Sequence, residues 1–223
     1  MSVAIETKNL HKSFKLGSIE VEVLKGIDIS INLGDFVSIM GQSGSGKSTL
    51  LYLIGGLDKP TLGSIKINGR ELSSMKDREE SEMRRREVGF VFQFYNLIPN
   101  LNVEENILLP ILLDGKKIRH YRKKLTDILE IVGLTDRRHH TPRELSGGQQ
   151  QRVAIARALI NEPEIILADE PIGNLDSKSG IEILELFKRI NQEAKKTIVQ
   201  VTHSIESTKY GNRIINLKDG RVC

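Results

Sequence analysis

A glycine-rich segment at residues 41–48 (GQSGSGKS) has the residue types and spacing of a loop that binds phosphate groups. Its glycines would let backbone N–H groups face a triphosphate, and a helix that follows would add its positive N-terminal end. Lys47 is expected to reach the β- and γ-phosphates, Ser48 to ligate Mg²⁺ and Thr49 to contact the α-phosphate. The alternative is that this segment is only a Gly- and Ser-rich turn that links a strand to a helix. The Gly-Lys-Ser spacing argues against that alternative. The residues expected to contact ATP here are Gly41, Ser43, Gly44, Ser45, Gly46, Lys47, Ser48 and Thr49.

An apolar segment at residues 164–170 ends in two neighbouring carboxylates, Asp169 and Glu170. Charge at the end of a buried strand is costly unless a cation meets it, and Mg²⁺ is the natural counterion beside a phosphate site. Asp169 would hold the metal through water. Glu170 points the other way in an extended chain and could orient and deprotonate an attacking water. A helix cap or a solvated turn is the alternative for an isolated acidic pair.

A third segment, residues 145–149 (LSGGQ), precedes a helical pattern at residues 150–159 and offers another glycine-rich anion site at a helix start. Alone it would be a routine helix N-terminus. Together with the phosphate loop and the acidic strand, it resembles the signature motif of ABC ATPases. The resemblance covers essentially the whole chain, and the motifs occur in the order that this family has.

The resemblance implies roles for further residues. Gln93 is similar to the glutamine that touches Mg²⁺ and the attacking water, and His203 to the histidine that bonds the γ-phosphate. Phe14 is similar to the aromatic residue that stacks on adenine, although it could instead be core. Residues 174–176 resemble the loop that crosses between two sites. The catalytic set is therefore Glu170, His203 and Gln93, and the metal set is Ser48, Gln93 and Asp169.

Members of this family enclose each ATP between the phosphate loop of one subunit and the signature motif of another. The resemblance therefore implies a head-to-tail homodimer with two sites, and an integral membrane permease as the second partner. No basic strand interleaved with Phe or Tyr is present, so a nucleic acid partner is not expected. By the same resemblance Ser146, Gly147 and Gly148 would serve the partner's nucleotide, and Gln149 and Asp176 are also expected to bind nucleotide.

Four further segments resemble the ATPases of lipoprotein release, macrolide efflux, antimicrobial-peptide resistance and cell-division signalling. They are residues 23–27, 56–61, 89–99 and 169–177. Two positions depart from the pattern, Gln42 where Pro is usual and Ile172 where Thr is usual. The implied function is ATP hydrolysis that powers export or extraction of a hydrophobic or peptide-like substrate, with signalling through a membrane partner as the alternative.

Other kinds of ABC ATPase fit less well. Repair ATPases insert a long coiled coil between the two nucleotide motifs, whereas one compact helical insert separates Lys47 from Asp169 here. Ribosomal ATPases carry two such domains in one chain. The presence of both Glu170 and His203 argues against a third interpretation, that the chain binds nucleotide without hydrolysing it.

Length and composition agree with a single α/β domain. The chain has 223 residues, of which 39% are hydrophobic and 28% charged, and a net charge of +4. Cys223 is the single cysteine, so a reducing compartment is expected. The longest apolar run, residues 107–113, is far shorter than the roughly 20 residues that span a bilayer, and no signal peptide is evident. We expect a cytoplasmic protein that is peripheral on the inner face of the membrane.

Hydrophobic periodicity predicts strands that alternate with helices, and therefore a parallel sheet covered on both faces. The expected fold is a P-loop NTPase core of residues 1–93 and 162–223, with an N-terminal antiparallel β subdomain and a helical insert at residues 94–161. Expected helices cover residues 47–57, 103–113, 118–132 and 177–191. Expected strands cover residues 3–10, 21–24, 27–33, 36–40, 64–67, 88–92, 165–169, 197–202 and 213–217.

Two further segments have residue types that would suit a surface role. Phe94, Tyr95, Leu97 and Ile98 directly follow Gln93, and an exposed patch there would be a docking site for a short helix of the permease. Packing of the helical insert is the alternative. Residues 137–140 (RRHH) lack an accompanying carboxylate or cysteine at ligand spacing, so we interpret them as a solvated loop.

Overall fold

A computed structural model describes residues 2–223 and divides the strands between two sheets. The first sheet is antiparallel, in the order β2-β1-β4-β5. Its strands are β1 (Val3–Leu16), β2 (Ile19–Asn32), β4 (Leu62–Ile67) and β5 (Arg70–Glu71). From Ile27 to Ile31 of β2, buried apolar residues alternate with exposed polar ones, as is typical of an antiparallel sheet with one solvated face.

The second sheet has the order β10-β9-β3-β8-β7-β6, and all neighbours except β10 and β9 are parallel. Its central strands are buried along almost their whole length because both of their faces are covered. The strands are β3 (Phe36–Met40), β6 (Val88–Val91), β7 (Ile165–Asp169), β8 (Thr197–Thr202), β9 (Arg213–Lys218) and β10 (Arg221–Val222).

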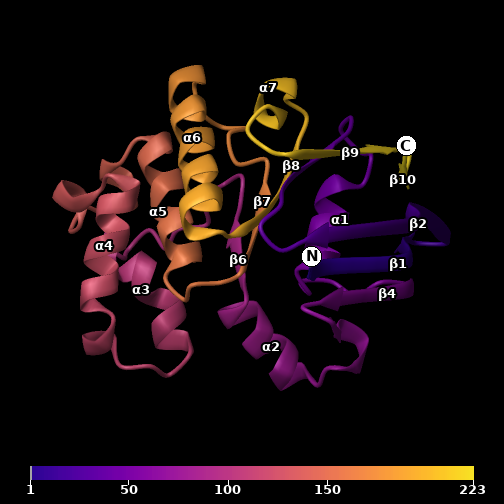
Figure 1. Cartoon of the computed structure of the whole chain (residues 1–223), viewed down its shortest axis with the longest axis horizontal. Coiled ribbons are helices and arrows are strands. Elements are labelled where there is room, and N and C mark those ends of the chain that lie inside the picture. Colours follow the sequence, from indigo (N-terminus) through magenta and orange to yellow (C-terminus); the bar gives the residue numbers. More distant parts are fainter. Residues whose placement is uncertain (1) are drawn as a thin grey trace.

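Helices cover both faces of the parallel sheet (Figure 1). At one end of the molecule α3, α4 and α5 form a helical lobe, and the antiparallel sheet lies at the other end. The helices are α1 (Lys47–Ile54), α2 (Asp77–Arg86), α3 (Val103–Leu113), α4 (Arg122–Val132), α5 (Gly147–Leu159), α6 (Ser177–Ala194) and α7 (Ile205–Thr208). Within residues 2–223, four 3₁₀ turns lie at Leu72–Ser74, Ile118–His120, Thr135–Arg137 and Pro142–Glu144.

Two hydrophobic cores lie on opposite faces of the parallel sheet. Alternate residues of β7 enter different cores, because successive side chains of a strand point to opposite faces. Ile166 and Ala168 pack with the helical lobe and α6, whereas Ile165 and Leu167 pack with α1 and the antiparallel sheet. The strand that ends in Asp169 is therefore fixed from both sides.

The predicted fold class is confirmed, with differences at element ends. The N-terminal strands are longer than predicted, because polar residues continue the β1–β2 pairing as far as Leu16 and Ile19. The helix after the phosphate loop ends at Ile54 and not at residue 57, since Gly55 caps it and Gly56 has a φ of 66°. The helix predicted at 118–132 is divided into a 3₁₀ turn and α4.

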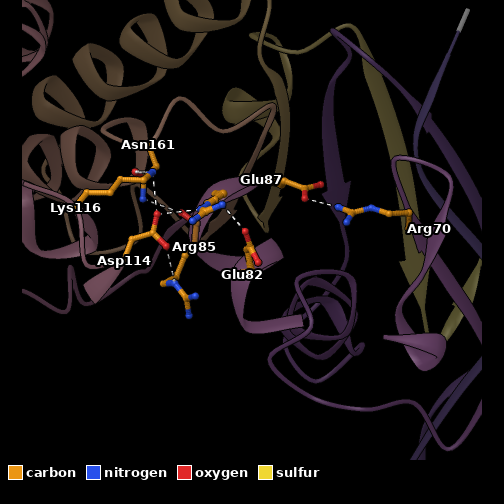
Figure 2. A network of polar contacts seen from close by, with 8 residues as sticks. Arg70, Glu82, Arg85, Glu87, Asp114, Lys116 and Asn161 are labelled. Carbon is orange, nitrogen blue, oxygen red and sulfur yellow. Dashed lines mark hydrogen bonds and ion pairs between the residues drawn. The ribbon is translucent and has the colours of Figure 1, made fainter. Parts of the chain in front are cut away.

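A buried carboxylate joins α2 to the helical lobe. Asp114 follows α3 directly, and its side chain is only 2% exposed. Its oxygens accept hydrogen bonds from Arg86 Nε at 2.9 Å and Arg85 Nε at 3.3 Å, and they pair with Lys116 Nζ at 2.8 Å. Asn161, after α5, donates to the Arg85 carbonyl oxygen at 2.9 Å. Figure 2 shows Arg85 and Lys116 around Asp114, with Asn161 beside Lys116.

These cations hold the pKa of Asp114 well below its usual range, with the Arg86 hydrogen bond as the largest cause. Because the pKa is lower in the folded protein, the stabilisation is complete above the unfolded pKa of about 3.9 and is lost as the pH falls toward the folded value.

We expect Asp114→Asn to lower the free energy of unfolding by about 1–3 kcal/mol near neutral pH, since it removes charged hydrogen bonds that no other group replaces. The difference from the wild type should shrink as the pH is lowered toward about 3. Urea unfolding over this pH range measures it. Asp127→Asn is the matched control, since Asp127 is exposed and has no ion pair within residues 2–223. A loss that does not change with pH would contradict this account of Asp114.

Candidate active site

A cavity of 750 Å³ opens where several parallel strands end. Gln93 comes shortly after β6, Glu170 directly follows β7 and His203 directly follows β8. Carboxyl ends of neighbouring parallel strands meet at one edge of a sheet, so residues far apart in the sequence meet there. The lining residues are Val23, Gln42, Ser43, Gly44, Gly46, Lys47, Ser48, Thr49, Gln93, Glu170 and His203.

The loop between β3 and α1 wraps around the ammonium group of Lys47. Lys47 Nζ donates hydrogen bonds to the carbonyl oxygens of Gly41 at 2.9 Å and Gln42 at 3.0 Å. Gly46 has a φ of 98°, and a Cβ there would lie 2.7 Å from Leu24 Cδ2, so this turn requires glycine. The loop thus places one positive charge beside the free N–H groups at the start of α1, which suits a phosphate.

Asp169, the last residue of β7, is 7% exposed and contacts Ser48 of the cavity lining. Its Oδ1 accepts a hydrogen bond from Ser48 Oγ at 2.8 Å, and its Oδ2 accepts one from Tyr52 Oη at 2.6 Å. Burial and Asp169 together raise the pKa of Tyr52 to about 12, with burial as the larger cause. Nothing in the motif spacing pointed to Tyr52, which was not among the predicted site residues.

The donor set around Asp169 fits Mg²⁺ bound together with ATP. No Lys, Arg or His side chain in the described chain forms an ion pair with this buried carboxylate, so a cation is the expected partner. Residues 2–223 contain no group of three or more His, Cys, Asp or Glu side chains that could hold a metal alone. Magnesium commonly uses one or two protein ligands, with phosphate oxygens and water completing its shell. Ser48, Asp169 and Gln93 remain the proposed protein contributors.

Glu170 and His203 are in direct contact at the wall of the cavity. His203 Nδ1 lies 3.0 Å from Glu170 Oε2. Glu170 has a φ of 44°, in the left-handed region that non-glycine residues seldom adopt, and such strain is found preferentially at functional sites. Its backbone N–H donates to the Val201 carbonyl oxygen at 3.1 Å. This bond to the neighbouring strand holds the strained residue, so that its carboxylate is presented to the cavity.

Gln93 is tied to the loop that follows β7. Asn174 Nδ2 donates to the Gln93 carbonyl oxygen at 3.0 Å, and Gln93 Nε2 lies 3.4 Å from Asn174 Oδ1. Two segments that the family resemblance assigned separate roles are therefore in direct contact within one subunit.

Phe14 does not line this cavity. Its ring is 40% exposed on β1, with Lys12 Nζ 4.8 Å from the ring centroid. The alternative of a core residue does not describe it either, because a core side chain would be buried. Adenine stacking by Phe14 stays a prediction.

The signature residues also lie outside the cavity. Ser146 is the exposed N-cap of α5, where its Oγ accepts from Gln149 N and Gln149 Oε1 accepts from Ser146 N. Asp176 caps α6, where hydrogen bonds from Ser179 lower the pKa of its carboxyl. Their placement away from this chain's own cavity is what a role in a partner's site requires, and that role stays a prediction.

Comparison with known proteins identifies the family. The family model described as ABC transporter matches residues 24–173. The chain belongs to the ABC transporter family. As an ATP-binding cassette it is an ATPase, and the predicted resemblance is confirmed. Within residues 2–223, the ABC cassette has no helix long and apolar enough to cross a bilayer.

Three relatives place the cassette within the family. It is 47% identical to MJ0796 of Methanocaldococcus jannaschii in a dimeric post-hydrolysis structure bound to ADP and Pi, with a TM-score of 0.90 and coverage of 98% and 96% of the two chains. It is 44% identical to the lipoprotein-releasing system ATP-binding protein LolD 1 of Chlorobium chlorochromatii, covering 98% and 90%. It is 47% identical to the macrolide export ATP-binding/permease protein MacB of Bdellovibrio bacteriovorus, covering 97% of this chain and 33% of MacB.

Proposed function

We propose that two copies of this cassette form a head-to-tail dimer whose Mg²⁺-dependent ATP hydrolysis powers an integral membrane permease. The observation that carries this proposal is the meeting of Lys47, Asp169, Glu170 and His203 at one edge of the parallel sheet. The permease would export or extract a hydrophobic or peptide-like substrate, because the relatives include LolD 1 and MacB. The cassette would then lie on the inner face of the membrane, held there by the permease.

Each residue has a defined task in hydrolysis. Lys47 Nζ would exchange its two carbonyl partners for phosphate oxygens, which carry far more negative charge. Bound Mg²⁺ would neutralise charge on the phosphates. Glu170 would accept a proton from the water that attacks the γ-phosphate, and His203, 3.0 Å away, would bond the γ-phosphate and steady the carboxylate. Gln93, held by Asn174, would position the same water.

The placement of the signature motif supports the proposed dimer. Ser146 is exposed, and α5 behind it runs for 13 residues, so its N-terminus is open to an anion supplied by another subunit. The dimeric arrangement of MJ0796 supports the same assembly for this chain. Ser146, Gly147 and Gly148 would then contact the γ-phosphate of the partner's ATP.

A groove of 320 Å³ beside the helical lobe is the proposed permease contact. Its lining is part apolar and part polar. The apolar residues are Val88, Phe90, Phe92, Leu109, Pro110, Leu113 and Ala158, and the polar ones are Arg84, Arg85, Asn96, Arg157 and Asn161. Leu113 is 69% exposed, and Phe94, close by in the sequence, is 72% exposed. Of the patch predicted from the sequence, Phe94 and Ile98 are exposed, whereas Tyr95 and Leu97 are partly buried. The apolar part of this groove, which includes the exposed Leu113, and the exposed Phe94 near it in the sequence suit a short amphipathic helix.

Copurification from membranes tests this assembly. We expect the cassette to be recovered with an integral membrane protein, and Phe94→Glu to weaken that complex by about tenfold or more, since a charge would enter an apolar contact. Nucleotide affinity of the isolated cassette should not change. Leu62→Glu is the matched control, because Leu62 is similarly exposed, at 63%, on β4 of the antiparallel sheet. Equal recovery of the two variants would exclude Phe94 from the permease contact.

A further inference from the structure

Tyr52 contacts the acidic strand from the helix that carries the phosphate loop. It lies four residues after Ser48 on α1, so both side chains project from one face of the helix. Ser48 Oγ donates to Oδ1 of Asp169 and Tyr52 Oη donates to Oδ2, at 2.8 Å and 2.6 Å. The two oxygens of one buried carboxylate are therefore bonded to hydroxyl groups one helical turn apart.

The ring of Tyr52 is held by other aromatic side chains. Its centroid lies 6.5 Å from that of Phe92 at an interplanar angle of 57°, and Phe92 stacks on Phe90 at 5.5 Å and 8°. Phe90 in turn packs on the backbone of Gly55, where any Cβ would collide with the ring. A ring fixed in this way aims its hydroxyl at a single place, because an aromatic side chain has only two torsions.

We propose that Tyr52 is a positioning residue for Asp169, one that sets the affinity of the site for its divalent cation. The hydroxyl of Tyr52 bonds Oδ2 and so fixes the rotation of the carboxylate, which keeps Oδ1 on the side of Ser48. Mg²⁺ requires near-octahedral geometry and keeps several waters. A carboxylate fixed in one rotation therefore suits Mg²⁺, because it offers the metal one oxygen and not both. This inference rests on the proposed metal site and adds a residue to it.

Removing only the hydroxyl of Tyr52 distinguishes positioning of Asp169 from a role in which the ring merely fills space in the core. Tyr52→Phe keeps the ring and its contacts with Phe92 but leaves Oδ2 without a donor. Outer hydrogen-bond partners of metal ligands commonly contribute about 10- to 100-fold to metal affinity, so we expect at least a tenfold loss here. ATP binding without metal should not change, because Tyr52 does not line the cavity.

The experiment measures Mn²⁺ binding by electron paramagnetic resonance, with the full cassette and a non-hydrolysable ATP analogue. A parallel fluorescence titration with the analogue in EDTA gives the metal-free affinity. Tyr52→Phe should weaken Mn²⁺ binding about tenfold and leave the EDTA titration unchanged. Tyr121→Phe is the matched control, since Tyr121 is a partly buried tyrosine in the helical lobe, where Lys116 and Lys124 lie near its ring.

A double-mutant cycle identifies the group through which Tyr52 acts. In an Asp169→Asn background, Tyr52→Phe should change Mn²⁺ affinity by less than about twofold, because the charged acceptor is gone. Mn²⁺ affinity that Tyr52→Phe does not alter would overturn the proposal. So would an equal loss in EDTA, which would show that the hydroxyl only supports the fold of α1. If Asp169→Asn alone leaves Mn²⁺ affinity unchanged, the metal site itself is wrong and the inference about Tyr52 fails with it.

Discussion

Replacing Glu170 by Gln should reduce the rate of ATP hydrolysis by about 10²–10⁴-fold, the contribution typical of a general base. Glutamine keeps the shape of the side chain and can still hold a water molecule, but it cannot accept a proton near neutral pH. Glu and Gln are both unbranched at Cβ, so the left-handed backbone at this position, with a φ of 44°, should be strained equally in both proteins. The loss should therefore be in turnover and not in folding.

Single-turnover hydrolysis measures this loss, with ATP affinity measured separately. The variant should bind ATP at least as tightly as the wild type, because a negative charge near the γ-phosphate has been removed. Glu193→Gln is the matched control, since Glu193 is an exposed residue of α6 outside the cavity. Hydrolysis by Glu170→Gln at the wild-type rate would remove Glu170 from the mechanism.

Replacing Lys47 by Ala should weaken ATP binding by about 10- to 100-fold. A hydrogen bond to a charged group contributes about 1.5–3 kcal/mol, and 1.4 kcal/mol corresponds to a factor of ten. Lys47 Nζ lies at the centre of the loop, bonded to the carbonyl oxygens of Gly41 and Gln42, and no other Lys or Arg lines the cavity in the described chain.

Titration with a fluorescent ATP analogue measures the affinity, and thermal unfolding without nucleotide shows whether the loop still folds. Lys123→Ala, on the exposed start of α4, serves as the control for loss of a positive charge alone. An affinity for the analogue that is equal in Lys47→Ala and in the control would contradict the assignment of the loop to phosphate binding.

The sheet could be predicted well because its strands are short apolar runs with polar residues at their ends. β3, β7 and β8 begin and end at the predicted residues. The antiparallel hairpin was underestimated because its outer half, around Phe14 and Val21, is held by strand pairing and not by a buried apolar face. Helix ends were missed where backbone conformation decides them, as at Gly55 and Tyr121.

The residues of the site that belong to sequence motifs could be predicted from the sequence. The carboxyl ends of parallel strands bring Gln93, Glu170 and His203 to the cavity that the phosphate loop lines, and the family resemblance supplied their roles. Tyr52 could not be found in this way, because its contact with Asp169 depends on how α1 faces β7. The predicted contact between the signature motif and ATP requires a second subunit. Sequence motifs can imply that subunit, but the structure of a single chain does not contain it.

Size-exclusion chromatography of the Glu170→Gln variant tests the two-site dimer most directly. The variant should elute as a dimer with ATP and as a monomer with ADP or without nucleotide, because slow hydrolysis preserves ATP and the lost charge relieves repulsion at both sites. Running the column at two ionic strengths separates this ATP-dependent dimerisation from attraction or repulsion between surface charges, which salt screens. Adding Ser146→Arg should restore the monomer by blocking the α5 N-terminus. The proposed assembly would be contradicted if the variant failed to dimerise at saturating ATP. It would also be contradicted if the variant eluted as a dimer with and without nucleotide and Ser146→Arg did not change this.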